Sequence, residues 1–298
     1  MSEDPDLIAR LYPVAWHTRS QVWIEDHPWC QNPYSRGSRE STASLTNQGN
    51  ADTLPCIELR FSNIPRTPAG LVFGTDRDTC DLVLPSRVEG LSRRHFALTY
   101  RNNFKDGLYR LVVRDLGSTH GTTVSYDDKL KSSRRQFDWI VDGFDHVRKA
   151  TMIIQPLPAF AFRLVVIRHD ISSPVYIHNV ERFRRGAAGP ERLLGGLGLQ
   201  SGPATQQNTN QHTAAGKQLL LPLECISRSS SEIVSRHWDA SSGEYYTCKQ
   251  PASDKYDKKV WEMRIKVMRQ VSHVSQDCLY FQLCCRAKLA LGQHRSPL

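Results

Sequence analysis

Between about residues 54 and 168, turn residues divide the chain into short segments, each of strand length and rich in β-branched or aromatic side chains. The segments are CIELRFSN, GLVFGT, CDLVLP, RHFALTY, LYRLVVRDL, TTVSY, QFDWIVDG, TMIIQPL and FAFRLVVIR. No helical periodicity interrupts them. Close and regular spacing of such segments is typical of an antiparallel β-sandwich. The sequence therefore predicts a mainly β fold.

The first fifty residues differ in composition from this run. They contain Trp16, Trp23 and Trp29, and the stretch that follows, NPYSRGSRESTASLTNQGNADT, is rich in Ser, Thr, Asn and Gly. Polar stretches of this kind cannot bury enough apolar surface to offset the entropy of ordering. We therefore predict a disordered tail over residues 1–50, with the tryptophans as an alternative docking segment, and the sandwich over residues 51–170.

A second change of composition follows the sandwich. Residues 171–217 form a linker rich in Gly, Ala, Gln, Asn and Thr, and IHNVERFRRG at its start is typical of a short amphipathic helix. Beyond it, LLLPLECISRS and GEYYTCKQP indicate strands, and DKKVWEMRIKVMRQVSH indicates a helix. One face of that helix carries Val260, Met263, Val267 and Val271. Residues 218–298 are thus expected to form a small α+β segment.

Charge and cysteine content narrow the choice of partner and compartment. The formal charge of +9 suits an acidic or phosphorylated partner, but the basic residues are dispersed, which argues against nucleic acid. No run approaches the roughly 20 apolar residues of a membrane helix, and the acidic start MSEDPDLIAR does not resemble a secretory signal. Eight cysteines without a CxxC pair favour free thiols inside the cell over disulfides or a metal site.

Polar residues gather in loops at the ends of three predicted strands. The stretch GLSRRHF places Ser92, Arg93 and His95 before a strand, and RDLGSTHGTTV separates two apolar runs with residues 117–122. A third loop lies within FGTDRDTCDLVLP. Gly74 and Gly121 are the residue type expected where the backbone needs positive φ or a close approach. Hydroxyls, cations and glycines gathered at strand ends are suited to binding an anion.

These blocks resemble the forkhead-associated (FHA) domain, a small β-sandwich that recognises phosphothreonine. The family pattern of Gly-Arg, Ser-x-x-His and Ser-x-Asn-Gly-Thr corresponds here to Gly74-Thr75, Ser92 to His95, and Ser118 to Thr122. The resemblance implies the following roles. Ser92 donates to phosphate, Arg93 contacts the ligand, Thr119 and His120 cradle the phosphothreonine and the peptide backbone, and Gly74, His95, Gly121 and Thr122 are structural.

Two residues depart from the family pattern. Thr75 replaces the arginine expected after Gly74, which removes a cation able to bind phosphate bidentately. Losing one charge-assisted bond costs about 1.5–3 kcal/mol, unless Arg77 in the same loop replaces it. His120 stands where asparagine is expected, with a different reach and a pH-dependent charge.

The polar residues of these loops also suit purely structural roles. Ser92 and Thr119 are of a type that often satisfies only turn backbone. His95 is of a type more often packed and hydrogen-bonded than in contact with a ligand. A catalytic arrangement of Ser92, His95 and Asp115 would need a geometry for which the sequence offers no support.

The C-terminal region resembles the start of a protein kinase small lobe, and the whole chain is similar to the N-terminal part of fungal FHA-domain serine/threonine kinases. The resemblance places the nucleotide lysine at Lys249. Ser227, Ser229 and Glu232 stand at the three glycine positions of the nucleotide loop, and Arg264 stands at the position of the helix glutamate. No HRD or DFG sequence follows before Leu298. We therefore expect a degenerate, truncated lobe without kinase activity.

Together, these observations predict a non-enzymatic adaptor that binds a phosphothreonine-containing protein, without cofactor, metal, membrane or nucleic acid. The family resemblance implies a nuclear or cytoplasmic location. Two alternatives remain. One is a non-functional or regulatory fragment, a pseudokinase, and the other is a kinase whose large lobe is missing from the gene model.

Overall fold

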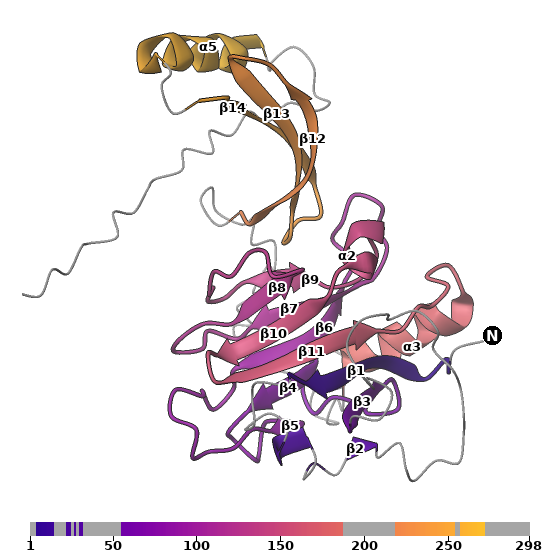
Figure 1. Cartoon of the computed structure of the whole chain (residues 1–298). Coiled ribbons are helices and arrows are strands. Elements are labelled where there is room, and N and C mark those ends of the chain that lie inside the picture. Colours follow the sequence, from indigo (N-terminus) through magenta and orange to yellow (C-terminus); the bar gives the residue numbers. More distant parts are fainter. Residues whose placement is uncertain are drawn as a thin grey trace, which may run out of the picture. The chain divides into compact units, whose positions relative to one another are not determined.

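The computed structural model describes residues 4–14, 22–24, 27, 30–31, 55–186, 218–253 and 257–271. The chain divides into two compact units, Met1–Lys217 and Gln218–Leu298, which are described separately. In the described residues, the first unit contains two β-sheets with the helices α2 (Asp145–Lys149) and α3 (Pro174–Arg185), and the second contains a three-stranded sheet with the helix α5 (Lys258–Val271) (Figure 1). Within the described ranges, every helix is too short or too polar to cross a membrane.

The larger sheet of the first unit has six strands in the order β2-β3-β1-β11-β10-β8. They are β1 (Leu7–Pro13), β2 (Cys30–Gln31), β3 (Cys56–Arg60), β8 (Thr123–Tyr126), β10 (Met152–Leu157) and β11 (Phe160–Val166). All neighbouring pairs are antiparallel. Side chains alternate between the two faces of a strand, and in β10 the buried Met152 and Ile154 alternate with half-buried Ile153 and Gln155.

The other sheet has five strands in the order β5-β4-β6-β7-β9. They are β4 (Leu71–Gly74), β5 (Leu82–Val83), β6 (Phe96–Arg101), β7 (Arg110–Asp115) and β9 (Asp138–Ile140). Only β4 and β5 are parallel among these pairs. β6 and β7 are almost wholly buried, because aliphatic and aromatic residues occupy both of their faces. The mainly antiparallel β architecture is the predicted fold class.

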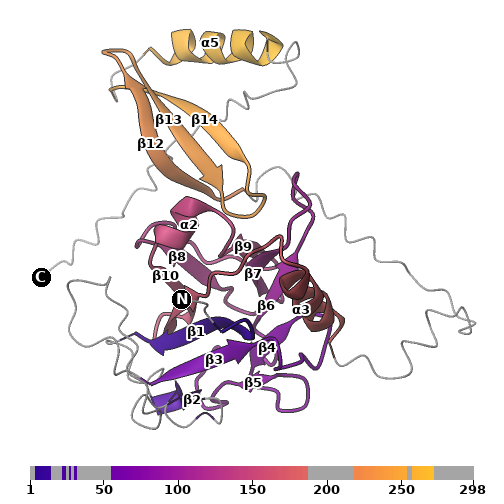
Figure 2. The ribbon, with the colours of Figure 1, turned by 90° about the vertical axis from the view of Figure 1, so that its right-hand side faces the viewer.

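The two sheets enclose an aromatic and aliphatic core (Figure 2). The Tyr126 hydroxyl of β8 donates to the Ile140 carbonyl of β9 at 2.7 Å and so joins the two sheets. At another edge, Phe61 stacks on Tyr100 of β6 with ring centroids 5.8 Å apart. A short helix, α2 (Asp145–Lys149), precedes β10. The packed core therefore fixes the positions of the strand ends and of the loops that follow them.

The prediction of disorder over residues 1–50 is wrong for the N-terminal strand. β1 pairs with both β3 and β11 in the middle of the six-stranded sheet. Trp23 is also buried, and its indole Nε1 donates to the Val83 carbonyl at 2.8 Å. The polar composition of the fifty residues as a whole masked the apolar run LIARLYPV. Residues 32–50, Trp16 and Trp29 lie outside the described residues.

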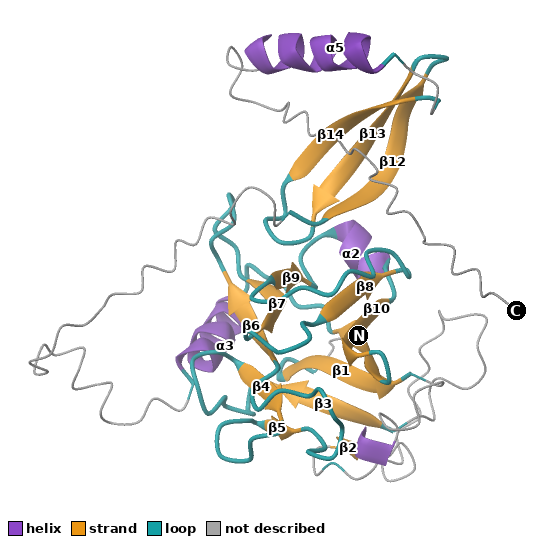
Figure 3. Ribbon diagram, turned by 90° about the vertical axis from the view of Figure 1, so that its left-hand side faces the viewer, coloured by secondary structure: helices purple, strands orange, loops and turns teal. Residues whose placement is uncertain are grey.

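The predicted linker likewise begins with structure that belongs to the sandwich. Its expected amphipathic helix is present as α3 (Pro174–Arg185), which lies beside β6 (Figure 3). Tyr176, Val180 and Phe183 are buried on its inner face. Proline opens α3, and Gly186, at φ +63°, follows its last residue. The first unit therefore reaches at least to Gly186, and residues 187–217 lie outside the described residues.

The second unit contains the two strands and the helix that the sequence predicts, and one further strand. β12 (Leu220–Arg228), β13 (Glu232–Asp239) and β14 (Tyr245–Pro251) form an antiparallel sheet, and α5 spans Lys258–Val271. The predicted apolar stripe of α5 is exposed at Val260, Met263 and Val267, while Trp261 is buried. Residues 272–298 lie outside the described residues.

Candidate functional site

The strand pairing brings three loop ends to one end of the five-stranded sheet. Phe73 pairs with Phe96, and Phe96 pairs in turn with Asp115. Because these strands are antiparallel, the end of β4, the start of β6 and the end of β7 lie side by side. The polar loops 75–81, 85–95 and 116–122 therefore meet, as their sequences suggested.

Ser92 and Thr119, which are 27 residues apart in the sequence, are in direct contact. The Thr119 backbone N–H donates to Ser92 Oγ at 2.9 Å. The Ser92 hydroxyl faces Thr119 Oγ1 at 3.4 Å, which is a long and weak hydrogen bond. Thr119 is exposed and Ser92 is half-buried. The amide thus fixes the Ser92 oxygen, while both hydroxyl protons can turn toward an acceptor in solution.

His95 holds the loops from behind. Its side chain is fully buried, its Nδ1 accepts from the Ser92 backbone N–H at 3.1 Å, and its Nε2 faces the Gly121 carbonyl at 3.4 Å. An acceptor at Nδ1 and a donor at Nε2 define a neutral imidazole. Burial lowers the pKa of His95 below its ordinary value, which agrees with that form. His95 thus bonds the loop of Ser92 to the loop of Gly121.

Gly74 permits a close approach between β4 and the Ser92 loop. A Cβ at this position would lie 2.1 Å from the Arg93 carbonyl oxygen. The next two residues bond the same segment, because Thr75 N donates to the Ser92 carbonyl at 3.1 Å and Asp76 N to the Arg93 carbonyl at 3.0 Å. The glycine is therefore needed for proximity and not for positive φ.

Arg93 is paired with an acidic residue that the sequence analysis did not single out. Arg93 Nη2 lies 3.2 Å from Asp76 Oδ2, and the Arg93 side chain is 85% exposed. The backbone N–H of Asp78 donates to Asp76 and is the main cause of a lowered Asp76 pKa. Arg93 thus lies at the mouth of the loops, where it can reach a ligand, but an internal carboxylate competes for it.

Arg77 is exposed, and only its backbone is bonded in the described structure. Its carbonyl accepts from Arg66 Nη1 at 2.8 Å. No contact joins the Arg77 side chain to Ser92 or Thr119 in the parts of the chain that are described. The loop itself is well anchored, because Cys80 packs in a small buried cluster with Val72 and Ala97.

Asp115 organises the loop that carries Thr119, a supporting role that sequence reasoning missed. Its buried carboxylate accepts from the backbone N–H groups of Gly117, Ser118 and Gln136 at 2.9 to 3.0 Å. It also accepts from the hydroxyls of Ser118 at 2.6 Å and Thr122 at 2.8 Å. Thr122 is fully buried, and its bond to Asp115 ties the end of the loop to its start.

Residues 133–136 lie against the same loop. Gly121 has φ +77°, and a Cβ there would lie 2.4 Å from Ser133 Oγ, so both conformation and space require glycine. Ser133 Oγ donates to the His120 carbonyl at 2.6 Å. His120 itself is exposed, and its ring lies against Gly90, where a Cβ would be 3.1 Å from it. His120 therefore lies at the rim of the site.

Lys249 belongs to the second unit. Its Nζ lies 3.8 Å from Glu232 Oε1, the residue at the third glycine position of the resembled nucleotide loop. The turn before β13 is held by exposed local bonds, such as Ser229 N to the Glu232 carbonyl at 2.8 Å. The side chain of Arg264 lies outside the described residues.

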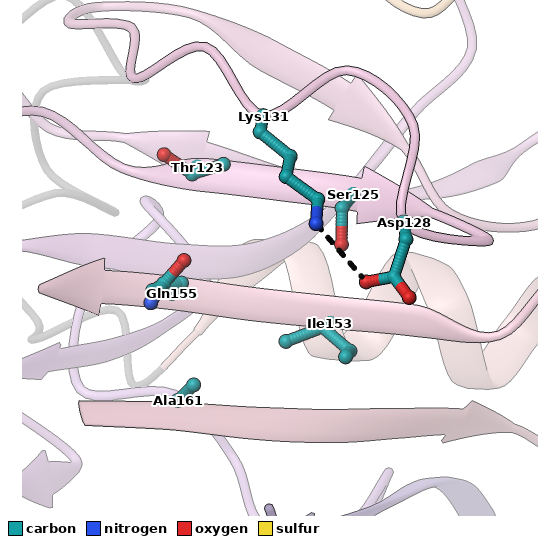
Figure 4. A pocket seen from close by; sticks show the side chains of 7 residues that line it. All are labelled: Thr123, Ser125, Asp128, Lys131, Ile153, Gln155 and Ala161. Atoms are coloured by element: carbon teal, nitrogen blue, oxygen red, sulfur yellow. Dashed lines mark ion pairs between the residues drawn. The ribbon is translucent and has the colours of Figure 1, made fainter. Parts of the chain in front are cut away.

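A shallow depression lies on the outer face of the six-stranded sheet, over β8, β10 and β11 (Figure 4). Its lining consists of Thr123, Ser125, Asp128, Lys131, Ile153, Gln155 and Ala161. Lys131 points over the sheet toward Asp128, with Nζ 3.6 Å from Oδ1. None of the residues of the three polar loops lines it. No group of three potential metal ligands occurs in the described part of the chain.

Residues 71–136 match the family model of the FHA domain. A search of curated proteins gave no match. Among solved structures, the chain is similar to the crystal structure of Rad53 1-466 in complex with AMP-PNP, with 10% identity and a TM-score of 0.32 over 92% of this chain and 50% of that chain. The chain thus spans about half the length of that chain. FHA domains are phosphopeptide-recognition modules, and the matched segment contains all three loops of the cluster.

Proposed function

We propose that this protein is a non-enzymatic adaptor that binds phosphothreonine-containing partners through the cluster of Ser92, Arg93, Thr119 and His120. A phosphate offers three strong acceptor oxygens and close to two negative charges at neutral pH. The cluster offers the complementary groups, which are two hydroxyl donors, one guanidinium and one imidazole.

The arrangement of Ser92 and Thr119 is the observation that carries the proposal. The Ser92 oxygen is fixed by the Thr119 amide at 2.9 Å, yet its proton has only a 3.4 Å contact to replace. Buried His95 and Asp115 hold the two backbones in place. A preorganised donor loses little freedom on binding, so more of the interaction with phosphate appears as affinity.

Arg93 is expected to add only modest affinity for phosphate. Thr75 supplies no charge where the family has arginine, and Arg93 must exchange its contact with Asp76 for one with phosphate. Arg77 is exposed in the neighbouring loop and is the candidate to replace the missing arginine. We therefore expect micromolar rather than nanomolar binding, weaker by about ten- to hundredfold than with the arginine present.

The second unit supports an adaptor more than an enzyme. Glu232 brings a negative charge to the turn that would have to face nucleotide phosphates, and it lies next to Lys249. The alternative is a regulatory pseudokinase fragment whose sandwich only packs. Cys56, Cys80 and Cys248 are buried and form no disulfide with a described residue, which suits the reducing nuclear or cytoplasmic compartment that we propose.

The test is fluorescence anisotropy of the full chain against one peptide sequence in three forms, with threonine, phosphoserine or phosphothreonine at its centre. We expect micromolar binding of the phosphothreonine form and much weaker binding of the other two. Equal affinity for the phosphorylated and unphosphorylated peptides would reject a phosphate reader. Equal affinity for phosphoserine and phosphothreonine would reject threonine specificity.

A further inference from the structure

The segment Ser133–Gln136 is bonded along the side of the Thr119 loop. Ser133 Oγ donates to the His120 carbonyl at 2.6 Å, and Arg134 and Thr122 exchange two backbone hydrogen bonds of 2.9 Å each. Gln136 N donates to Asp115 Oδ1 at 2.9 Å. Three successive anchors thus fix this segment next to the residues that we assign to phosphate.

Two adjacent arginines, Arg134 and Arg135, therefore lie on a segment bonded to the loop that carries Thr119 and His120. Arg135 is exposed, and Arg134 is half-buried with its Nε shielded from solvent and without a hydrogen-bond partner. Neither arginine forms an ion pair with any residue that the structure describes.

Several arginines elsewhere in the same sandwich are neutralised within the fold. Arg101 and Arg114 share Asp138. Arg110 pairs with Asp106, and Arg148 pairs with Asp142. The cluster's own Arg93 pairs with Asp76. Arg134 and Arg135 form no such pair with a described residue and are adjacent beside the Thr119 loop, so together they leave a local positive charge that an external anion can satisfy.

We propose that Arg134 and Arg135 form a second anionic subsite that selects phosphothreonine peptides with a flanking negative charge. This inference rests on the proposed phosphothreonine function. The chemistry suits either a carboxylate or a second phosphate, because a guanidinium binds both through the same pair of N–H donors. Lys131 contributes little, since it turns toward Asp128 over the outer face of the sheet (Figure 4).

The test measures anisotropy of the full chain with phosphothreonine peptides whose flanks are neutral, carry two aspartates on the N-terminal or the C-terminal side, or carry a second phosphoserine. For the natural sequence we expect about 3- to 10-fold tighter binding with an anionic flank on one side, lost as salt rises. The Arg134→Gln/Arg135→Gln variant should lose this gain and keep its affinity for the neutral peptide within about twofold.

A matched variant carries the same charge change at a distance. Arg182 and Arg185 are exposed on the last turn of α3, which lies on the opposite side of the sandwich from β8 (Figure 2, Figure 3). Arg182→Gln/Arg185→Gln should keep the full gain. The single variant Arg135→Gln, at an exposed position, should lose part of it even if the double variant unfolds.

Several results would overturn the subsite. Equal binding of neutral and anionic peptides by the natural sequence would do so, as would a gain that survives in Arg135→Gln and in a folded double variant. If no phosphothreonine peptide binds at all, the proposed function fails, and the subsite fails with it. If the neutral phosphopeptide binds but flanking charge has no effect, only the subsite fails.

Discussion

Two turns rich in hydroxyl residues, one in each unit, differ in what holds them. The loops around Ser92 and Thr119 rest on buried His95 and Asp115, whose bonds reach across 21 to 26 residues of sequence. The turn before β13 is held by local, exposed bonds, such as the one in which Ser229 Oγ accepts from the backbone N–H of Glu232 at 3.0 Å. Polar residues at a strand end can form a preorganised site only where buried groups fix the backbone and leave donors free.

The largest expected effect comes from removing the buried support of the first unit. Asp115→Ala leaves five donors without their acceptor, so we expect the free energy of unfolding to fall by about 3–5 kcal/mol. We also expect phosphopeptide binding to be lost. Denaturant unfolding and peptide anisotropy measure the two losses.

The second unit provides a matched control for this substitution. Asp239 is equally buried and accepts from Leu219 N, Ser241 N, Ser241 Oγ and Ser242 Oγ. Asp239→Ala should destabilise the second unit and leave peptide affinity unchanged. If Asp239→Ala abolished binding as well, the distinction between the two regions would be lost.

Ser92→Ala separates the site from its support. It removes the hydroxyl donor, so we expect phosphothreonine affinity to fall about 10- to 100-fold. Unfolding free energy should change by less than about 1 kcal/mol. Titration of the variant with phosphopeptide gives the first quantity, and urea denaturation gives the second. Ser229→Ala, in the second unit, should leave phosphothreonine affinity unchanged, and a loss of affinity in that variant would contradict the account.

Stability should depend on pH through His95. Burial lowers the folded-state pKa of His95, so the unfolded chain binds this proton more tightly and stability falls as pH drops below about 6.5. Burial also lowers the pKa of His27, to about 4, in the same unit. The free energy of unfolding, measured at several pH values, should therefore depend less steeply on pH in His95→Gln and in His27→Gln than in the natural sequence. If the pH dependence of the unfolding free energy were unchanged in His95→Gln, the prediction that buried neutral His95 causes it would be wrong.

The smallest effect is expected in the second unit. Lys249 and Glu232 form a partly exposed pair 3.8 Å apart, so Lys249→Ala should change stability by about 0–1 kcal/mol. Added Mg·ATP should leave the melting temperature of the natural sequence unchanged, because a bound nucleotide would raise it. A rise that disappears in Lys249→Ala would revive the nucleotide site.

Local pattern was enough to predict the strands of the sandwich, because alternation of apolar residues is a short-range signal. It failed for β1, where seven strand residues were judged by the composition of the polar segment around them. It also missed β13, because Ile233, Val234 and Trp238 are the apolar residues of that strand and do not alternate with polar ones.

For the site, the spaced motif identified Ser92, His95, Thr119 and the glycines correctly as neighbours, but not their supports. Asp115 and Gln136 meet through a bond between residues 21 positions apart. Asp76 contacts Arg93 across 17 positions. Such contacts depend on which loops the sheet brings together, and no short-range pattern encodes that. The alternative was that Ser92 only satisfies the backbone of its own turn. Its hydroxyl oxygen instead accepts from the Thr119 N–H in another loop.

The most direct test of the central claim is a two-dimensional amide NMR titration of the full chain with the phosphothreonine peptide. It observes both hydroxyl-rich turns in one sample. The account predicts saturable shifts at the backbone amides of Ser92, Arg93, Thr119 and His120, and none at residues 226–234. Shifts confined to the second unit, or no shifts at Ser92 and Thr119 while the peptide binds, would contradict it.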